Sequence, residues 1–165
     1  PPIKLNPAFV DRVVAYLSQV PLVVRHRISD IELHENGCRF TAEITEEDLN
    51  PFHSVDGGIY AFLLDNVTGF ATFCRYPADY GTSTLDLQAT YARPFKTGKV
   101  VCEAHIIKAG RSVCMVRGDV EDEDGTVLAY ATSNLFVGRG LQLMDDAVKA
   151  AGFPALPDKF IDDEC

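Results

Sequence analysis

The sequence predicts an α+β fold in which a curled antiparallel sheet of about six strands wraps around one long central helix, with extra N- and C-terminal helices. The helix is predicted because the run from Gly57 to Tyr76 is apolar on most of a helical wheel, with one acid, Asp65, inside it. Such a helix belongs in a core, and the concave face of a curled sheet can cover it. Strand-like runs precede and follow it. We expect a single domain over residues 1–165, with an N-terminal helix in 1–21, a core in 22–137 and a C-terminal extension in 138–165.

The residues before the central helix predict a helix and a hairpin. Asn6 or Pro7 begins an amphipathic helix, and Pro21 would end it. Two alternating runs, Val23 to Leu33 and Cys38 to Ile44, flank an Asn-Gly pair, which is a strong hairpin signal. The chain is therefore expected to enter the central helix from a pair of antiparallel strands.

The start of the central helix is marked by an acid and two glycines. Asp56 is placed to cap the first turn, and Gly57 and Gly58 leave the amide N–H groups of that turn open to an incoming oxygen atom. Farther along, the spacing of Asp65 and Thr68 puts them on one helix face. We expect that face to line a cleft or a subunit contact.

Four further strands are predicted after the central helix, as a meander. They alternate in hydrophobicity and are separated by short turns that each contain glycine. A short helix and a Pro-rich acidic tail follow. The expected strands run from Thr82 to Arg93, Val100 to Lys108, Ser112 to Val120 and Val127 to Val137, and the expected helix runs from Leu141 to Ala150.

Charge and composition exclude several classes of protein. A net charge of −9 argues against a general binder of nucleic acid or anionic membranes, whose binding surface would be basic.

The five cysteines are odd in number, lack a CxxC spacing and mostly lie in apolar runs, so we interpret them as reduced core thiols. The four histidines are scattered, and we expect no metal site. No signal-peptide pattern is present at the N-terminus, so we expect a cytoplasmic protein, or an organellar matrix protein if a presequence was removed.

The segment NPFHSVDGGIYAFLLDNVTGFAT, residues 50–72, resembles the signature of the hotdog-fold acyl-CoA thioesterases of the phenylacetic-acid-degradation and thioesterase-superfamily-member type. The resemblance covers about residues 41–137, and its collinear pieces are more specific together than any one alone. It implies the hotdog fold, a thioester hydrolase acting on acyl-CoA or acyl-carrier-protein esters, no cofactor beyond the coenzyme A of the substrate, and a homodimer or homotetramer. The further matches are Gly81-Thr82-Ser83, Tyr91-Ala92-Arg93-Pro94, Gly110-Arg111-Ser112 and residues 124–129.

The resemblance also implies catalytic roles. Asp65 would be the general base or nucleophile, and the amide of Gly57 or Gly58 would receive the thioester oxygen. Asn50 would bind the carbonyl or the water, and Ser83 would help to hold the water. Gly57 lies about 12 Å from Asp65 along the helix, too far to serve the same carbonyl. In the family the site forms between subunits, with the acid from one subunit and the Asn and Gly from the other, so the two groups need not come from one chain. The rival interpretations are backbone hydrogen bonds for Asn50 and Ser83, and a structural ion pair for Asp65.

Asp56 departs from the family pattern, because the usual His-Gly-Gly is changed here to Asp56-Gly57-Gly58. A carboxylate beside an oxyanion site opposes the charge that develops there. The sequence leaves three roles open for Asp56: a protonated acid, a helix cap that turns away, or the mark of a site converted to other chemistry or to binding.

Two other hypotheses stay open. Asp48 and His53 resemble the D-x-N-P-L-H motif of the (R)-specific enoyl-CoA hydratases, another hotdog branch, in which Asp and His act as an acid–base pair. A surface-loop position is the simpler interpretation of His53. The third hypothesis is a non-catalytic protein that binds acyl-CoA or another small ligand on the same fold.

Coenzyme A carries phosphates, so an acidic protein that binds it needs a basic edge. Residues 91–117 hold six of the 15 basic residues of the chain, with only Glu103 in opposition. Each of them also has a simpler interpretation as a solubilising residue at a strand end. The expected substrate-binding residues are Asp56, Gly58, Thr68, Arg93, Lys108, Gly110, Arg111 and Ser112.

Overall fold

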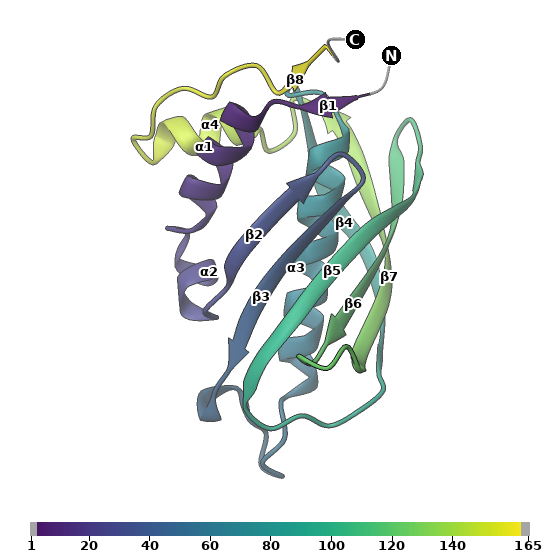
Figure 1. Cartoon of the computed structure of the whole chain (residues 1–165). Helices are drawn as coiled ribbons and strands as arrows, with labels where there is room; N and C mark the ends of the chain where they lie inside the picture. Colours follow the sequence, from purple (N-terminus) through teal and green to yellow (C-terminus); the bar gives the residue numbers. More distant parts are fainter. Residues whose placement is uncertain (1–2, 163–165) are drawn as a thin grey trace.

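A six-stranded antiparallel sheet curls around one long helix in the computed structural model, which describes residues 3–162 (Figure 1). The order of the strands is β2-β3-β5-β6-β7-β4. This arrangement confirms the predicted curled sheet with a central helix and extra helices at both ends. The elements of the core are β2 (Ser29–His34), β3 (Gly37–Ile44), the short 3-10 helix η1 (Glu46–Asp48), α3 (Gly57–Arg75), β4 (Tyr80–Tyr91), β5 (Gly98–Ala109), β6 (Val113–Glu121) and β7 (Val127–Arg139).

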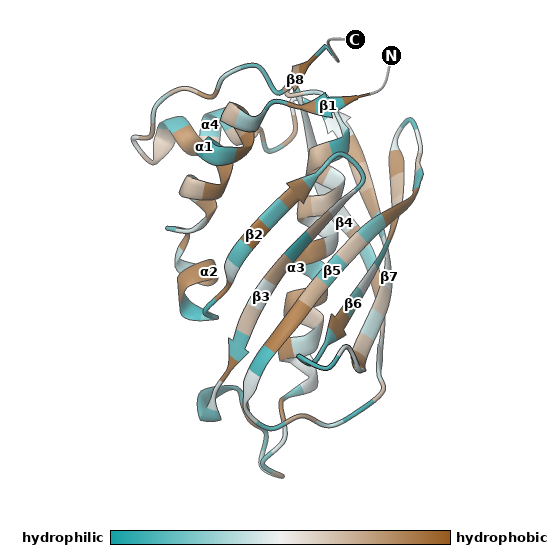
Figure 2. Cartoon of the chain, viewed as in Figure 1, coloured by the Kyte–Doolittle hydropathy of each residue, from teal (hydrophilic) through white to brown (hydrophobic). Residues whose placement is uncertain are grey.

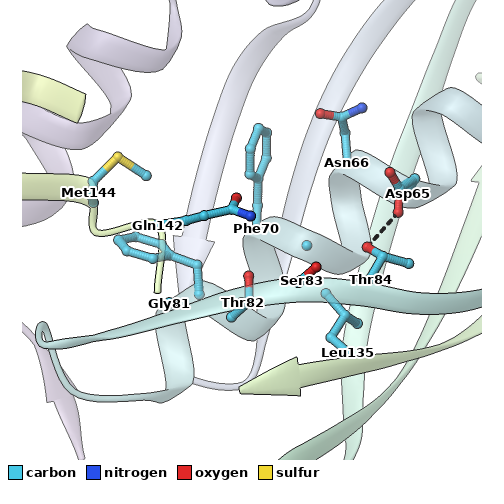
Figure 3. A pocket seen from close by; sticks show the side chains of 12 residues that line it. Asp65, Asn66, Phe70, Gly81, Thr82, Ser83, Thr84, Leu135, Gln142 and Met144 are labelled. Atoms are coloured by element: carbon cyan, nitrogen blue, oxygen red, sulfur yellow. Dashed lines mark hydrogen bonds between the residues drawn. The ribbon is translucent and has the colours of Figure 1, made fainter. Parts of the chain in front are cut away.

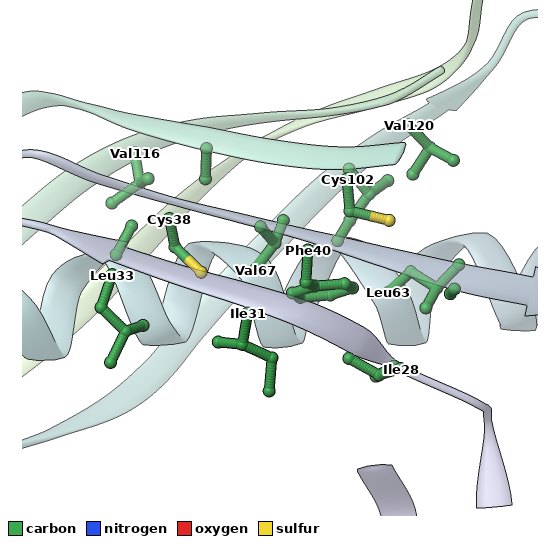
Figure 4. Packing of buried hydrophobic residues seen from close by; sticks show 14 of the residues in the cluster. Ile28, Ile31, Leu33, Cys38, Phe40, Leu63, Val67, Cys102, Val116 and Val120 are labelled. Carbon is green, nitrogen blue, oxygen red and sulfur yellow. The ribbon is translucent and has the colours of Figure 1, made fainter. Parts of the chain in front are cut away.

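The core lies between α3 and the concave face of the sheet. Apolar and polar residues alternate along β2, β3 and β5 (Figure 2), which turns one apolar side of each strand toward the helix. Phe40 of β3 meets Leu63 and Val67 of α3 there, and all three are buried (Figure 4). Four cysteines are buried free thiols, and burial raises the pKa of the Cys74 thiol to about 12. Cys165 lies outside the described residues.

The hairpin before α3 is confirmed, but the strand that opens it is shorter than predicted. His34 pairs with Gly37, so Glu35 and Asn36 alone form the loop. The first part of the predicted strand from Val23 is instead α2 (Pro21–Arg25). Proline begins this helix because the first turn needs no N–H donor there. The preceding helix α1 (Pro7–Leu17) starts as predicted, with the Asn6 side chain accepting from the Ala8 amide at 3.0 Å.

The predicted meander of four strands is wrong in one respect. β5, β6 and β7 pair in order, but β4 pairs with β7 and lies at the edge of the sheet. The chain leaves β4, passes the N-terminal end of α3, where Val55 donates to the Phe95 carbonyl at 2.8 Å, and enters β5 beside β3. Hydrophobic alternation predicts strands but not their partners. Among the described residues, the outer edge of β4 pairs with no other strand.

The two ends of the described chain meet beside the C-terminal end of α3 (Figure 1). β1 (Lys4–Leu5) pairs with β8 (Phe160–Ile161). Lys159 is buried, donates from Nζ to the Phe73 carbonyl and lies 3.9 Å from the centre of the Phe73 ring. The C-terminal extension is therefore attached to the end of the central helix. Across residues 3–162, no helix is long and apolar enough to cross a bilayer.

The last helix, α4 (Met144–Ala150), begins three residues later than predicted. Gly140 has a φ of +75° and Gln142 a φ of +43°, and neither backbone conformation continues a right-handed helix. The segment before α4 instead passes tightly over the start of β4. An added Cβ at Gly81 would lie only 1.3 Å from the Leu141 carbonyl oxygen.

Candidate active site

A cleft of about 500 Å³ lies between α3, the start of β4 and the segment before α4 (Figure 3). On α3 it is lined by a half-buried stripe that contains Asp65, Asn66, Gly69, Phe70 and Phe73. Their spacing places them on one face of the helix, turned away from the fully buried face. The cleft therefore has a polar end at Asp65 and an aromatic end at Phe73.

The Asp65 carboxylate is positioned by a hydroxyl group from the edge strand. Thr84 Oγ1 donates to Asp65 Oδ1 at 2.8 Å (Figure 3). No basic side chain of a described residue forms an ion pair with Asp65, so the rival interpretation of a structural ion pair finds no partner there. Asp65 is an acid at the wall of a cleft, oriented by a neutral donor.

Thr84 was not predicted as a site residue, because a β-bulge changes the side-chain alternation of β4. The apolar series of β4 suggests that odd-numbered residues, including Ser83, face α3. The register shifts between Thr84 and Asp86, and Leu85 is 59% exposed. Before this bulge, Thr84 lies opposite the buried Leu135 and faces α3, whereas Ser83 lies opposite the exposed Phe136. Ser83 borders the cleft, and the hydrogen bond to Asp65 comes from Thr84.

The expectation that Thr68 shares the cleft face with Asp65 is wrong. Thr68 is completely buried, and its hydroxyl donates to the Leu64 carbonyl at 2.8 Å. Its methyl group faces Gly118 of β6, where an added Cβ would lie 3.0 Å away. Threonine can occupy the core of a helix because its hydroxyl is satisfied by the carbonyl four residues earlier. Thr68 is therefore a packing residue rather than a substrate-binding residue.

The N-terminal end of α3 forms a second, separate feature. Asp56 caps the helix, and its Oδ2 accepts from the Gly58 amide at 2.8 Å, so Gly58 is not open to an incoming oxygen as predicted. Gly57 lies under the ring of Tyr91, where an added Cβ would be 3.0 Å from the ring. Gly57, Tyr91 and Arg93 contribute to a cavity of about 260 Å³. Of the two glycines, Gly57 is thus the remaining candidate donor to an oxyanion.

Asn50 holds the loop that leads into α3. Its Oδ1 accepts from the amides of Phe52 and Ser54 at 2.9 and 3.3 Å. This is the backbone role that the rival interpretation gives it. The Nδ2 group donates to no described residue and is the part of Asn50 that a substrate could use.

Asp48 and His53 are not joined as an acid–base pair. The Asp48 carboxylate is buried, receives a hydrogen bond from Arg27 at 2.6 Å and accepts from the Thr45 amide at 2.9 Å. His53 is exposed at the tip of the loop with a φ of +60° and makes no ion pair with Asp48. Asp48 therefore has a structural role, and no described contact supports the hydratase hypothesis.

The basic residues do not form one continuous edge within a chain. Arg93 lies at the N-terminal end of α3 and donates to the Val127 carbonyl at 2.6 Å. Lys108, Gly110, Arg111 and Ser112 line a cavity of about 480 Å³ at the other end of β5. From Lys99 to Lys108 the strand spans ~30 Å. Within the described range, no group of His, Cys, Asp and Glu is arranged to hold a metal ion.

The predicted catalytic residues thus fall into two groups in one chain. Asp65 lies in the cleft, which Ser83 borders, while Asn50 and Gly57 lie near the N-terminal end of α3, about 12 Å away along the helix axis. One chain by itself does not bring both groups to one carbonyl.

Comparisons with known proteins give the family. Residues 52–129 match the thioesterase superfamily. The chain is 30% identical to human acyl-coenzyme A thioesterase 13 over 98 residues, which are 58% of this chain and 69% of that protein. The chain belongs to the thioesterase superfamily.

Solved structures agree with this assignment. A phenylacetic acid degradation-related protein of Ralstonia eutropha is 28% identical and superposes with a TM-score of 0.67 over 78% of this chain and 98% of its own. A thioesterase of Haemophilus influenzae, 22% identical, has a TM-score of 0.71 over 77% of this chain and 89% of its own, and shares the fold. The resemblance to hotdog-fold thioesterases is confirmed.

Proposed function

We propose that this protein hydrolyses the thioester bond of acyl-CoA or acyl-carrier-protein esters, with Asp65 as general base or nucleophile. The observation that carries the proposal is the half-buried Asp65 carboxylate, held in a cleft by Thr84 at 2.8 Å. Membership of the thioesterase superfamily and the name of the human relative support an acyl-CoA ester as the substrate.

In the general-base form of the reaction, Asp65 accepts a proton from a water molecule as the water oxygen attacks the thioester carbonyl. The carbonyl oxygen becomes an oxyanion, and the C–S bond then breaks to release the thiol and the acid. The Thr84 hydroxyl keeps the carboxylate aimed at the water. Donors at a helix N-terminus stabilise the oxyanion because the helix dipole and free amides point toward it.

A second copy of the chain would supply those donors. No strand in residues 3–162 pairs with the outer edge of β4, which is 12 residues long, and such an edge is ready to pair with another strand. If two β4 strands pair antiparallel about an axis near Leu87 and Gln88, Tyr91 of one copy lies opposite Thr84 of the other. Tyr91 covers Gly57, and Thr84 binds Asp65. This pairing would bring the two groups of site residues together.

Release of free thiol from a panel of acyl-CoA esters tests the proposal. We expect Asp65→Asn to lower kcat by ~100-fold or more, and Thr84→Val to lower it less, with recovery in Thr84→Ser. The matched control is Asp11→Asn, because Asp11 is an exposed acid on α1, away from the cleft and from the edge of β4. A wild type inactive on every ester, or an Asp65→Asn variant as active as the control, would contradict the proposal. Hydration of enoyl-CoA and ligand binding would then be measured.

A further inference from the structure

The far end of the Asp65 cleft is formed by residues that the thioesterase match does not include. That match ends at residue 129, whereas Gln142 and Met144 complete the cleft wall from the segment before α4. Figure 3 shows the Gln142 side chain extending across the cleft toward Phe70, with Met144 beyond it. This segment therefore contributes directly to the space that extends from Asp65.

The backbone of the segment is fixed in place. The Gly140 amide donates to the Asp79 carbonyl at 2.8 Å, and the Leu141 carbonyl lies against the backbone of Gly81. Gln142 itself has a φ of +43°, a left-handed conformation that is costly for a residue with a side chain. These constraints fix the backbone of Gln142 beside the cleft, into which its side chain extends (Figure 3).

The cleft presents different chemistry along its length. Phe70 follows Asp65 by five residues on the helix, which is ~8 Å along the axis, and Phe73 by eight residues, ~12 Å. The Gln142 amide lies beside Phe70 (Figure 3), on an exposed residue, and forms no hydrogen bond with any described residue. An amide can both donate and accept, so a group that reached it would need a polar atom at that distance.

We propose that Gln142 and Met144 determine which acyl groups are hydrolysed, and that the preferred acyl group is of medium length with a hydroxyl or oxo oxygen near its distal end. The inference rests on the proposed function, with the thioester at Asp65. The acyl chain then runs along α3 to Phe70, where its oxygen meets the Gln142 amide, and Met144 limits its length.

The test compares octanoyl-CoA with 8-hydroxyoctanoyl-CoA. We expect the wild type to favour the hydroxylated ester by ~3- to 10-fold in kcat/KM, the ratio given by one neutral hydrogen bond. Gln142→Leu, of similar size and apolar, should remove or reverse that preference. Gln19→Leu is the matched control, since Gln19 is an exposed glutamine in the turn after α1. Met144→Ala should raise kcat/KM for dodecanoyl-CoA relative to octanoyl-CoA.

The outcomes separate this inference from the function on which it rests. A wild type that hydrolyses the esters with no preference, or a Gln142→Leu variant with the wild-type ratio, overturns the inference and leaves the thioesterase proposal standing. A wild type that hydrolyses none of the esters overturns both. Thermal unfolding of each variant shows whether a change in ratio comes from a folded protein.

Discussion

Replacing Gly81 with alanine tests how the segment before α4 is fitted to the cleft. The new Cβ would lie 1.3 Å from the Leu141 carbonyl oxygen, and ordinary contact begins near 3.4 Å, so the Leu141 backbone has to move by about 2 Å (3.4 − 1.3). Neither atom belongs to a flexible side chain that could turn away. Overpacking of this kind costs ~1–3 kcal/mol of unfolding free energy, which lowers Tm by ~2–10 °C in a chain of this size.

The displaced segment carries Gln142 and Met144, so Gly81→Ala should also change the acyl preference in the direction of Gln142→Leu. Gly69→Ala is the matched control. Gly69 lines the same cleft from the interior of α3, and an added Cβ there meets no atom within 4 Å. That variant should stabilise the protein by ~0.5–1 kcal/mol, because alanine favours a helix interior over glycine. Urea unfolding measures both. Equal stability of the two variants, with an unchanged acyl preference for Gly81→Ala, would refute this reasoning.

Three further predictions concern charged residues. Asp56→Ser keeps a cap for the Gly58 amide and removes a negative charge beside the expected oxyanion, so it should raise kcat by a few-fold in the thiol-release assay with little change in Tm, and a lower kcat would count against the oxyanion placement. Burial lowers the pKa of Lys159 from 10.5 to about 8, so the unfolded chain binds more protons between these values. The wild type should therefore gain ~2–3 kcal/mol relative to Lys159→Met as pH rises from 8 to 10.5 in urea unfolding, and a flat difference would contradict the buried lysine. Asp48→Ala removes the carboxylate that binds Arg27, which keeps its hydrogen bonds to the Glu43 and Arg25 carbonyls. It should cost ~1–3 kcal/mol by the same method while keeping thioesterase kcat, and loss of that activity in a folded variant would contradict a purely structural role for Asp48.

Local sequence signals predicted the central helix and the hairpin, because each depends on neighbouring residues. Asp56 caps α3 as expected, and the hairpin forms at the Asn-Gly signal, with Asn36 in the loop and Gly37 at the start of β3. The pairing of β4 with β7 is not a local property, because β5 and β6 lie between these two strands in the sequence. The predicted meander was wrong for that reason.

The residues of the candidate site could be predicted where a sequence motif marks them, but not where packing determines the direction of the side chain. Asp65 could be identified because an acid inside an apolar helix is rarely buried without a partner or a function. Thr68 was misplaced, because threonine satisfies its hydroxyl within its own helix. Thr84 was missed because the bulge at Leu85 reverses the alternation of β4. The contribution of Gln142 depends on contact between segments about 60 residues apart, to which no sequence pattern points.

A heterodimer of two inactive variants tests the proposed site most directly. Asp65→Asn removes the carboxylate, and Asn50→Asp removes the amide donor while keeping the oxygen that holds the Asn50 loop. The two variants would be expressed together with different affinity tags, and the doubly tagged protein isolated. If the site is shared between copies, one of its two sites is intact, and thiol release should reach about half the wild-type rate. A heterodimer as inactive as its two parents, or a wild type that is monomeric at micromolar concentration, would contradict the shared site.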